Sequence, residues 1–398
     1  MSALNAVVKR HETLRTSFAE EDGSPLQVVS SNEPFPLRRH DLSDHSPGER
    51  DRELARVIRD EARSSFDLGR APLARGHLLR LGPDDHYLLL NVHHIVFDGW
   101  SQGLLIRELS SLYRSAASGE MPKPPPLDVQ YRDFAIAQRN ALQNGSLSRH
   151  ALYWKQKLTD LDPLTLPSDG ERPSFFSYRG GEHWFSLGPI LARTLPKLGT
   201  ANRATLFMTL MAAFQAFLST GSQQQDICVG TAFANRANVD FERVIGFFVN
   251  SLAIRTDLSG DPPFREVLSR VVATTLEAYE HRDLPFETVV QEVNPPRDPS
   301  RHPLFQVMLI LHNLPPAALE FPGLHSEWHP IASNTSKFDL MLELLPMSED
   351  IRARVRYNAD LFEPVTINRF CKTFVRFLHN LVDTPGQCVS ALARSASV

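Results

Sequence analysis

The chain has 398 residues, of which 42% are hydrophobic and 22% are charged, and its formal net charge at pH 7 is -4. This composition allows a full hydrophobic core, and the length predicts two domains or one large one. The weakly acidic balance gives no broad electrostatic surface for nucleic acid or for an anionic membrane. The three cysteines have neither the number for a disulfide framework nor the spacing of a metal site. No stretch is long and apolar enough to span a bilayer and the N-terminus is no signal peptide, so we expect a soluble, cytoplasmic protein.

The first half of the chain predicts one buried strand followed by one amphipathic helix. An apolar run at residues 87–90 predicts the strand, and leucines at positions 104, 105, 109 and 112 predict the helix, which a proline-rich stretch at 122–126 ends. Prolines and glycines between Leu158 and Gly181 resist both helix and central strand, so we expect the chain to cross there between two lobes. The predicted division is an N-terminal lobe over 1–165 and a C-terminal lobe over 180–398.

The second half alternates helices with strands. Hydrophobic residues recur every three or four positions over 206–218, 264–271 and 370–381, which predicts three helices. Apolar runs predict strands at 226–231 and 305–311, and two alternating segments joined by residues 347–350 predict a β-hairpin. Helices and strands in both halves place the chain in the α/β (α+β) class with two lobes.

The most informative segment is the run HHIVFDGWS at residues 93–101. Neighbouring side chains on an extended backbone point to opposite faces, so only one of His93 and His94 can face a given cavity, and the other is held in packing. A histidine at the end of a strand, in a turn with Asp98 and Gly99, suits proton transfer near neutral pH. The alternative is a pair of packed histidines; the preceding strand and the following helix favour the functional interpretation.

Six segments in the same order resemble the second to seventh core motifs of the condensation domains of non-ribosomal peptide synthetases. They are residues 10–16 (RHETLRT), 93–101 (HHIVFDGWS), 131–135 (YRDFA), 245–251 (IGFFVNS), 281–287 (HRDLPFE) and 297–304 (RDPSRHPL). The resemblance covers nearly the whole chain. It implies two chloramphenicol-acetyltransferase-like lobes that form a V-shaped pseudo-dimer with a central tunnel.

The resemblance also implies an acyltransferase reaction. A donor and an acceptor peptidyl carrier protein would each insert a phosphopantetheine arm, and the acceptor amine would attack the donor thioester to form an amide, with an adenylation domain as a further partner. His94 matches the catalytic histidine and His93 the structural one. A single imidazole can take the amine proton or stabilise the intermediate, and holding both arms in one tunnel adds proximity. The residues of the motifs at 93–101 and 245–251 are most similar to those of the subtype that joins two L-configured residues. Nothing in the sequence indicates a bound cofactor or metal.

Asp98 has two interpretations, as the acid of a catalytic triad or as a buried carboxylate in an ion pair. We expect the ion pair, because an unpaired buried carboxylate is costly. The resemblance implies an arginine as its partner, and Arg236 is the first choice, which would join the two lobes. Arg10 and Arg15 are the alternatives, and either of them can equally lie on a solvated helix face. Gly99 would let the backbone approach the reaction centre, or it is only a turn glycine.

The chain departs from the family pattern at its start, because Met1 lies nine residues before Arg10 and leaves no room for the first core motif. We therefore expect an N-terminally truncated lobe, in a free-standing domain, a fragment or a misplaced gene start, and the truncation leaves activity open. An epimerisation domain is disfavoured, since residues 230–236 (GTAFANR) lack its second-lobe glutamate. A stand-alone acyltransferase and a non-catalytic carrier-docking module remain as alternatives.

Overall fold

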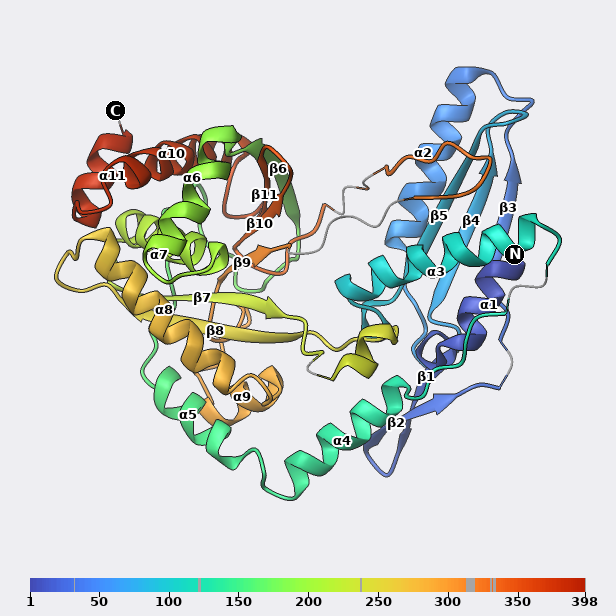
Figure 1. Cartoon of the computed structure of the whole chain (residues 1–398), viewed down its shortest axis with the longest axis horizontal. Helices are drawn as coiled ribbons and strands as arrows, with labels where there is room; N and C mark the ends of the chain where they lie inside the picture. Colours follow the sequence, from blue (N-terminus) through green and yellow to red (C-terminus); the bar gives the residue numbers. More distant parts are fainter. Residues whose placement is uncertain are drawn as a thin grey trace. The chain divides into compact units, whose positions relative to one another are not determined.

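The chain forms two compact units in the computed structural model, which describes all residues except 32, 121–122, 237, 313–318, 330, 332–333 and 398. Unit 1 comprises Met1–Asn144, Arg236–Val249 and Pro316–Ile331 (Figure 1). Unit 2 comprises Gly145–Asn235, Asn250–Pro315 and Ala332–Val398. This division differs from the predicted one, since two segments from the second half of the sequence pack into unit 1.

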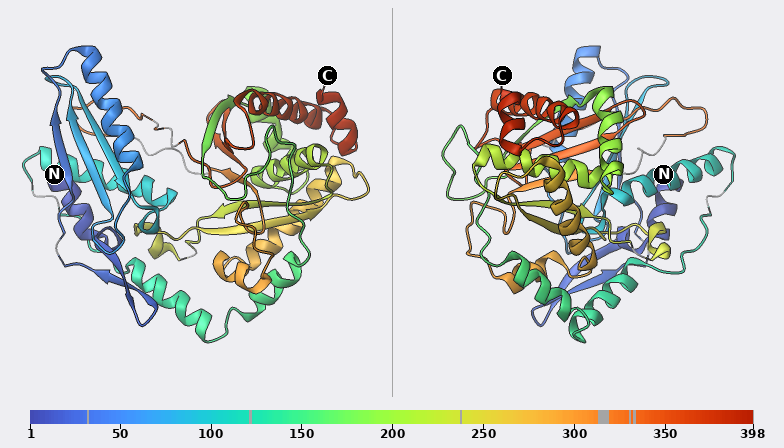
Figure 2. Two further views of the ribbon diagram at one scale, coloured as in Figure 1. Left: turned by 180° about the vertical axis from the view of Figure 1, so that it is seen from behind. Right: turned by 60° about the vertical axis from the view of Figure 1, so that its left-hand side comes forward.

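Unit 1 is built around a three-stranded sheet with the order β3-β4-β5. Strands β3 (Leu37–Asp41) and β4 (Ala74–Arg80) are parallel, and β5 (His86–Val92) runs antiparallel to β4. The three strands lie side by side in the views of Figures 1 and 2. The predicted strand at 87–90 is therefore the centre of β5.

Helices cover both faces of this sheet. On one face, Val57 of α2 (Pro47–Arg63) packs in a small core with Leu42 and Leu79. On the other face, α1 (Ser2–Arg10) and α3 (Gly99–Ala117) share a core with Ala74. Odd and even positions of β4 thus enter different cores, as strand geometry requires.

The remaining elements of unit 1 surround this layer. They are the 3-10 turn η1 (Glu12–Arg15), the antiparallel pair β1 (Thr16–Glu21) and β2 (Ser24–Val29), the turn η2 (His94–Val96), α4 (Tyr131–Gln143) and the turn η3 (Val239–Arg243). The turn η3 belongs to residues 236–249, which we call the returning segment because the chain comes back to unit 1 there. Its Ile245 is fully buried in the core formed by α1 and α3.

Unit 2 contains a mixed six-stranded sheet with the order β6-β11-β10-β9-β7-β8. The strands are β6 (Gly180–Ser186), β7 (Asp226–Phe233), β8 (Asn250–Asp257), β9 (Val307–Leu311), β10 (Leu340–Pro346) and β11 (Ile351–Asn358). The hairpin β10–β11 is antiparallel, with Glu343 opposite Arg354, whereas β9 is parallel to both β10 and β7. The predicted hairpin and the predicted strands at 226–231 and 305–311 are confirmed.

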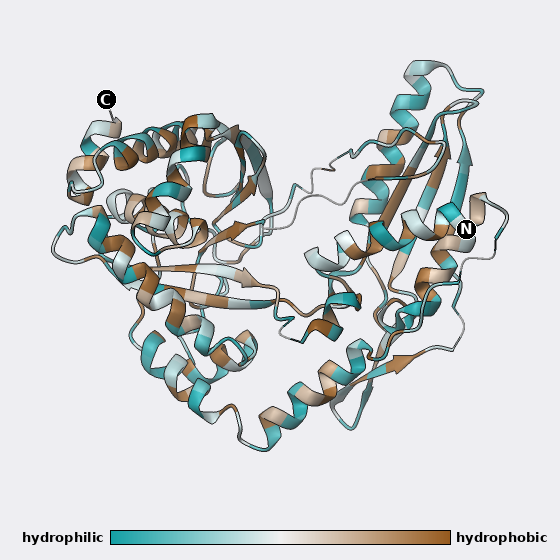
Figure 3. Cartoon of the chain, in the orientation of Figure 1, coloured by the Kyte–Doolittle hydropathy of each residue, from teal (hydrophilic) through white to brown (hydrophobic). Residues whose placement is uncertain are grey.

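Helices bury the apolar face of this sheet in a large core. They are α5 (Ser148–Leu158), α6 (Gly188–Ala201), α7 (Leu206–Ser222), α8 (Phe264–Glu280), α9 (Phe286–Val293), α10 (Pro364–Asp383) and α11 (Val389–Ser397). Phe214 of α7 and Phe374 of α10 are fully buried with ring centroids 5.7 Å apart. Figure 3 shows hydrophobic residues along the strands of this sheet and on the helices that cover it. The three predicted helices are α7, α8 and α10.

The proline-rich stretch before β6 lies inside unit 2 and not between the units. The Leu164 amide donates to Gln306 Oε1 over 2.7 Å, and Arg172 forms an ion pair with the buried Asp339. An irregular backbone is held here by side chains that are distant in sequence, which composition alone does not reveal. No single helix among the described residues is long and apolar enough to cross a membrane; the bent pair of α6 and α7 reaches the required length and composition together.

Candidate active site

Strand β5 carries the histidine motif to the edge of the sheet in unit 1. Leu89 is buried in the strand, and the His93 amide donates to the Leu73 carbonyl over 2.9 Å, just beyond the last ladder pair of β4 and β5. The chain then makes the short turn η2 and enters α3 at Gly99. Both histidines therefore lie at a strand end, between a sheet and a helix that are fixed by their cores.

His93 is a structural residue by its contacts. Its Nδ1 accepts a hydrogen bond from the Ile95 amide at 3.0 Å, so the side chain caps the turn η2. Its ring packs edge-on against Phe66, with centroids 5.7 Å apart. Because a backbone amide can only donate, the neutral His93 ring carries its proton on Nε2.

His94 has the opposite arrangement. It is exposed, and its Nδ1 lies 2.5 Å from the Phe97 carbonyl oxygen. A carbonyl only accepts, so the proton of the neutral ring is on Nδ1 and the lone pair is on Nε2. The Phe247 ring meets the imidazole at a right angle, with centroids 5.0 Å apart, and fixes its plane. A basic nitrogen is thus held at an accessible position in one tautomer.

Asp98 serves the fold of this site and is not a triad acid. It is 3% exposed, and its Oδ1 accepts hydrogen bonds from the Ser101 amide at 2.8 Å and the Ser101 hydroxyl at 2.7 Å, which caps the N-terminus of α3. Its Oδ2 accepts from the Phe248 amide at 3.1 Å. Both carboxylate oxygens also lie 3.1 Å from a guanidinium nitrogen of Arg236. The carboxylate is therefore satisfied by groups other than the imidazole of His94.

Arg236 holds the returning segment to the motif. Its side chain is 2% exposed, its guanidinium donates to the carbonyls of Phe241 and Val244, and its Cζ lies 4.0 Å from the centre of the Phe248 ring. Burial lowers the pKa of Arg236, and the charge of Asp98 opposes this shift. Both partners belong to unit 1, so the expectation that this pair joins two lobes is wrong; it closes a loop within one unit.

The two alternative arginines bind elsewhere. Arg10 Nε lies 3.1 Å from Glu108 Oε1, and its guanidinium also donates to the Pro125 carbonyl. Arg15 donates to the Ser30 carbonyl. Arg10 as the partner of Asp98 is therefore wrong, and so is Arg15. The folded chain places Glu108 of α3 beside Arg10, and it places Ser30, which directly follows β2, beside Arg15.

Sequence reasoning missed two side chains that hold the returning segment, His11 and Thr13, and the acid that supports His11. His11 is completely buried, accepts from the Ile245 amide at 3.2 Å through Nδ1 and bonds Glu108 through Nε2 at 2.8 Å. Thr13 donates to the Ile245 carbonyl at 2.7 Å. Burial lowers the pKa of His11, although its bond to Glu108 raises it. The signal was present in the RHETLRT run, but the residues it contacts are more than 200 positions away.

Three further residues of the motifs at 93–101 and 131–135 have defined surroundings: Gly99, Trp100 and Tyr131. Gly99 is exposed, and an added Cβ would meet no described atom within 4 Å. Trp100 donates to the Glu242 carbonyl at 2.9 Å, and Tyr131 to the Phe247 carbonyl at 2.8 Å, so both are scaffold for the returning segment. Among the described residues no group of three or more His, Cys, Asp or Glu side chains is arranged to hold a metal ion.

A mixed fold in two units, with an accessible histidine at a strand end braced by a buried Asp–Arg pair, agrees with the comparisons with known proteins. The family model for the condensation domain matches residues 1–395. The chain belongs to this family, whose function in non-ribosomal peptide synthesis is amide-bond formation by acyl transfer.

Relatives and solved structures support this assignment. The chain is 43% identical to chondramide synthase of Chondromyces crocatus over 96% of its own length, and 39% identical to a linear gramicidin synthase of Brevibacillus parabrevis over 98%. It spans 10% and 5% of these two proteins. The X-domain from teicoplanin biosynthesis is similar in structure, with a TM-score of 0.89, 28% identity and coverage of 98% of this chain and 88% of that one. The first condensation domain of the calcium-dependent antibiotic synthetase has the same chloramphenicol-acetyltransferase-like fold, with a TM-score of 0.78, 22% identity and coverage of 98% and 88%.

Proposed function

We propose that this chain joins a donor aminoacyl or peptidyl thioester to an acceptor aminoacyl thioester, both held on carrier proteins, and that His94 is its catalytic residue. The observation that carries the proposal is the fixed tautomer of His94. Its Nδ1 proton is engaged by the Phe97 carbonyl at 2.5 Å, and the ring is exposed, so Nε2 is available to accept a proton.

The reaction needs one proton relay and no redox partner. The acceptor nitrogen attacks the donor carbonyl carbon, a C–N bond forms, and the C–S bond breaks as the tetrahedral intermediate collapses. Nε2 of His94 takes the proton that the nitrogen loses, and this proton is returned to the departing thiolate sulfur. The positioning residues are His93, Asp98 and Arg236, which hold the turn that orients His94. At Gly99, the first residue of α3, no described atom lies within 4 Å of the place that a Cβ would take.

In this proposal both substrates are bound to carrier proteins, and an adenylation domain is a further partner. The multidomain synthetases among the relatives support such partners in general. We assign the reaction to the subtype that joins two L-configured residues, because of the residues in the motifs at 93–101 and 245–251. We place it in the cytoplasm, with which three unpaired cysteines are compatible.

The test is a single-turnover reaction with the purified chain. A donor carrier loaded with an aminoacyl group is mixed with a loaded acceptor carrier, and the dipeptidyl thioester is measured by mass spectrometry. We expect product with the unaltered chain, and a loss of about 10²-fold or more in rate with His94→Ala, which is the usual contribution of a general base. His86→Ala is the matched control, because His86 is an exposed histidine at the start of the same strand.

Three outcomes would contradict the proposal in different ways. Unchanged turnover in His94→Ala would remove His94 from the catalytic role. Binding of carriers or of another protein without any product would favour a recruiting module. That second candidate has specific support, because an X-domain that is 28% identical has been solved in a complex with OxyB. Turnover with a free amine or alcohol but not with a loaded acceptor carrier would favour a stand-alone acyltransferase.

A further inference from the structure

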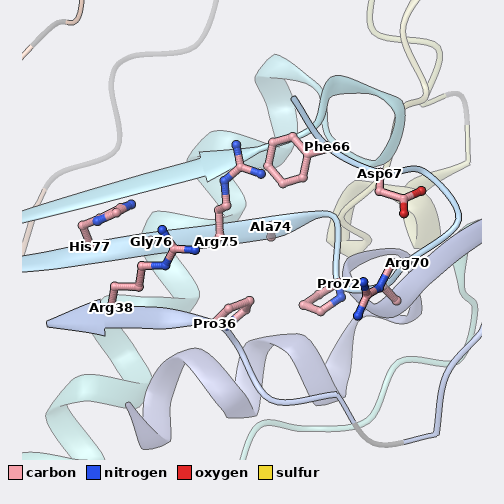
Figure 4. Close-up of a pocket in the computed structure, with 11 residues that line it drawn as sticks. Pro36, Arg38, Phe66, Asp67, Arg70, Pro72, Ala74, Arg75, Gly76 and His77 are labelled. Carbon is pink, nitrogen blue, oxygen red and sulfur yellow. The ribbon is translucent and has the colours of Figure 1, made fainter. Parts of the chain in front are cut away.

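A cavity of about 220 Å³ lies in unit 1, on the face of the sheet that α2 covers and beyond the C-terminal end of that helix. Its floor is the start of β3 and β4, and its wall is the loop between α2 and β4. The residues that line it are Pro36, Arg38, Phe66, Asp67, Arg70, Ala71, Pro72, Ala74, Arg75, Gly76 and His77 (Figure 4). Three arginines against one aspartate give this lining a clear excess of positive charge.

Two of the three arginines, Arg38 and Arg70, have no hydrogen-bond or ion-pair partner among the described residues. Both side chains are exposed. Figure 4 shows them on opposite sides of the cavity, with Phe66 above and the rings of Pro36 and Pro72 below. Two unpaired guanidiniums across a small cavity form an arrangement suited to an oxyanion, which each can bind through two parallel N–H donors.

The other charged groups of the lining are already committed. Arg75 donates to Glu61 at 2.5 Å and to the carbonyls of Ser64 and Ser65 at the end of α2, and His77 bonds Glu61 at 2.9 Å. Asp67 accepts from the Gly69 amide at 2.9 Å. Glu61 is 5% exposed and lies behind this wall, so it offsets the charge of Arg75 and leaves that of Arg38 and Arg70 free.

We propose that this cavity is a binding site for a phosphate monoester, with Arg38 and Arg70 as ligands of the phosphate and the Pro36, Phe66 and Pro72 rings as the contact for its organic group. A dianion matches two unpaired cations, and the apolar walls favour an ester over the free ion. The site is separate from the proposed reaction at His94, and it does not depend on that function.

The wall of this site also contacts the histidine motif. Arg75 Cζ lies 3.9 Å from the centre of the Phe66 ring, and the same ring meets His93 edge-on at 5.7 Å. A ligand that packs against Phe66 therefore changes the surroundings of the His93 ring. Side-chain NMR resonances of His93 provide a readout that reports the position of the ligand and not only its charge.

The test is a calorimetric titration of the full chain with phenyl phosphate and, separately, with inorganic phosphate. We expect phenyl phosphate to bind more tightly, with a change in the NMR resonances of His93. Equal affinity for the two probes would show that the organic group contributes nothing to binding. It would then overturn the proposal that the ligand is an ester and assign the site to the free ion. No heat and no spectral change with either probe would overturn the anion site itself.

Variants locate the binding. Arg38→Gln and Arg70→Gln are each expected to weaken phenyl phosphate binding about 10-fold, because each removes a charge-assisted contact. Arg39→Gln is the matched control, since Arg39 is an exposed neighbour on β3 whose side chain lies on the opposite face of the strand. We expect that control to bind within about twofold of the unaltered chain. A double variant combines Arg38→Gln and Arg70→Gln, and circular dichroism checks that it is folded. Unchanged phenyl phosphate binding in this variant would overturn the assignment of the site to these arginines.

Discussion

Two adjacent histidines in this chain hold their protons on different ring nitrogens. At His93 a backbone amide donates to Nδ1, and at His94 a backbone carbonyl accepts from Nδ1. The local backbone, which turns from β5 into η2, determines this difference. A pair that is identical in the sequence is therefore divided into a capping side chain and an available base.

Asparagine substitutions separate these two roles, because an asparagine side chain reaches the position of Nδ1 but offers no base. His93→Asn keeps an acceptor for the Ile95 amide, so we expect it to retain more stability than His93→Ala, which loses a cap of about 1 kcal/mol. His94→Asn keeps a donor for the Phe97 carbonyl, so we expect unchanged stability and a lost catalytic step. Chemical unfolding and single-turnover rates measure the two effects. Equal rates for His94→Asn and the unaltered chain would contradict the proposed role of Nε2.

At the scale of elements, the returning segment is fitted tightly to α4. A Cβ added at Gly246 would lie 2.4 Å from Tyr131 Cδ2, so the glycine permits the contact. Tyr131 in turn donates to the Phe247 carbonyl and packs edge-on against Phe248 at 5.0 Å. The position of Phe247 beside His94 depends on this fit.

We expect Gly246→Ala to destabilise unit 1 by about 1–3 kcal/mol, as overpacking does in a core. Gly99→Ala is the matched control, because a Cβ there meets nothing described within 4 Å. It should leave the unfolding midpoint unchanged, since the added methyl group would meet no described atom within 4 Å. Denaturant unfolding and turnover are measured for both variants. A Gly246→Ala protein as stable as the control would show that Tyr131 moves without cost.

The sheet of unit 2 contains a buried acid that makes its stability depend on pH. Burial opposes ionisation of Glu343, but hydrogen bonds from His312 and Arg354 and the charge of Arg356 outweigh it and lower its pKa from 4.5 to about 2. A carboxyl group whose pKa is lower in the folded state stabilises the fold above its unfolded pKa, and this contribution is lost as the pH falls. The window of loss thus runs from about 4.5 down to about 2.

Glu343→Gln should therefore be less stable than the unaltered chain at neutral pH, and the gap should narrow as the pH falls through this window. The comparison is the unfolding midpoint of unit 2 at several pH values. Glu349→Gln is the control, because Glu349 is an exposed glutamate in the loop that follows β10. A constant gap between Glu343→Gln and the unaltered chain across the window would contradict the lowered pKa.

At the scale of the whole chain, local pattern predicts the elements and the motif but not how distant segments combine. The alternation of β10 and β11 and the apolar stripe of α7 are visible within short windows, and both are confirmed. The partner of Arg10 is not visible, because Glu108 is 98 positions away and no pattern distinguishes it from other acids. The place of the returning segment in unit 1 is not visible in the sequence for the same reason. It depends on the bond between Ile245 and His11 and on the bond between Phe248 and Asp98, each of which joins residues more than a hundred positions apart.

This assembly from separate segments predicts that residues 1–144 do not reach full stability alone. Without the returning segment, Asp98 loses the Arg236 guanidinium and the Phe248 amide, and the core around Leu14 and Leu105 loses Ile245. Removing one partner of a buried ion pair costs about 3 kcal/mol or more. We expect a synthetic peptide of residues 236–249 to bind the fragment and to slow amide hydrogen exchange in α1 and α3.

The control peptide carries Arg236→Gln, which keeps the hydrophobic contact of Ile245 and removes the charge that Asp98 requires. It should protect the fragment less than the natural peptide does, and the difference should persist at high salt because the pair is buried. A fragment whose exchange is equally slow with and without the natural peptide would mean that the sheet and its helices are stable without the returning segment. The buried Asp98–Arg236 pair would then orient the motif and contribute little to the stability of unit 1.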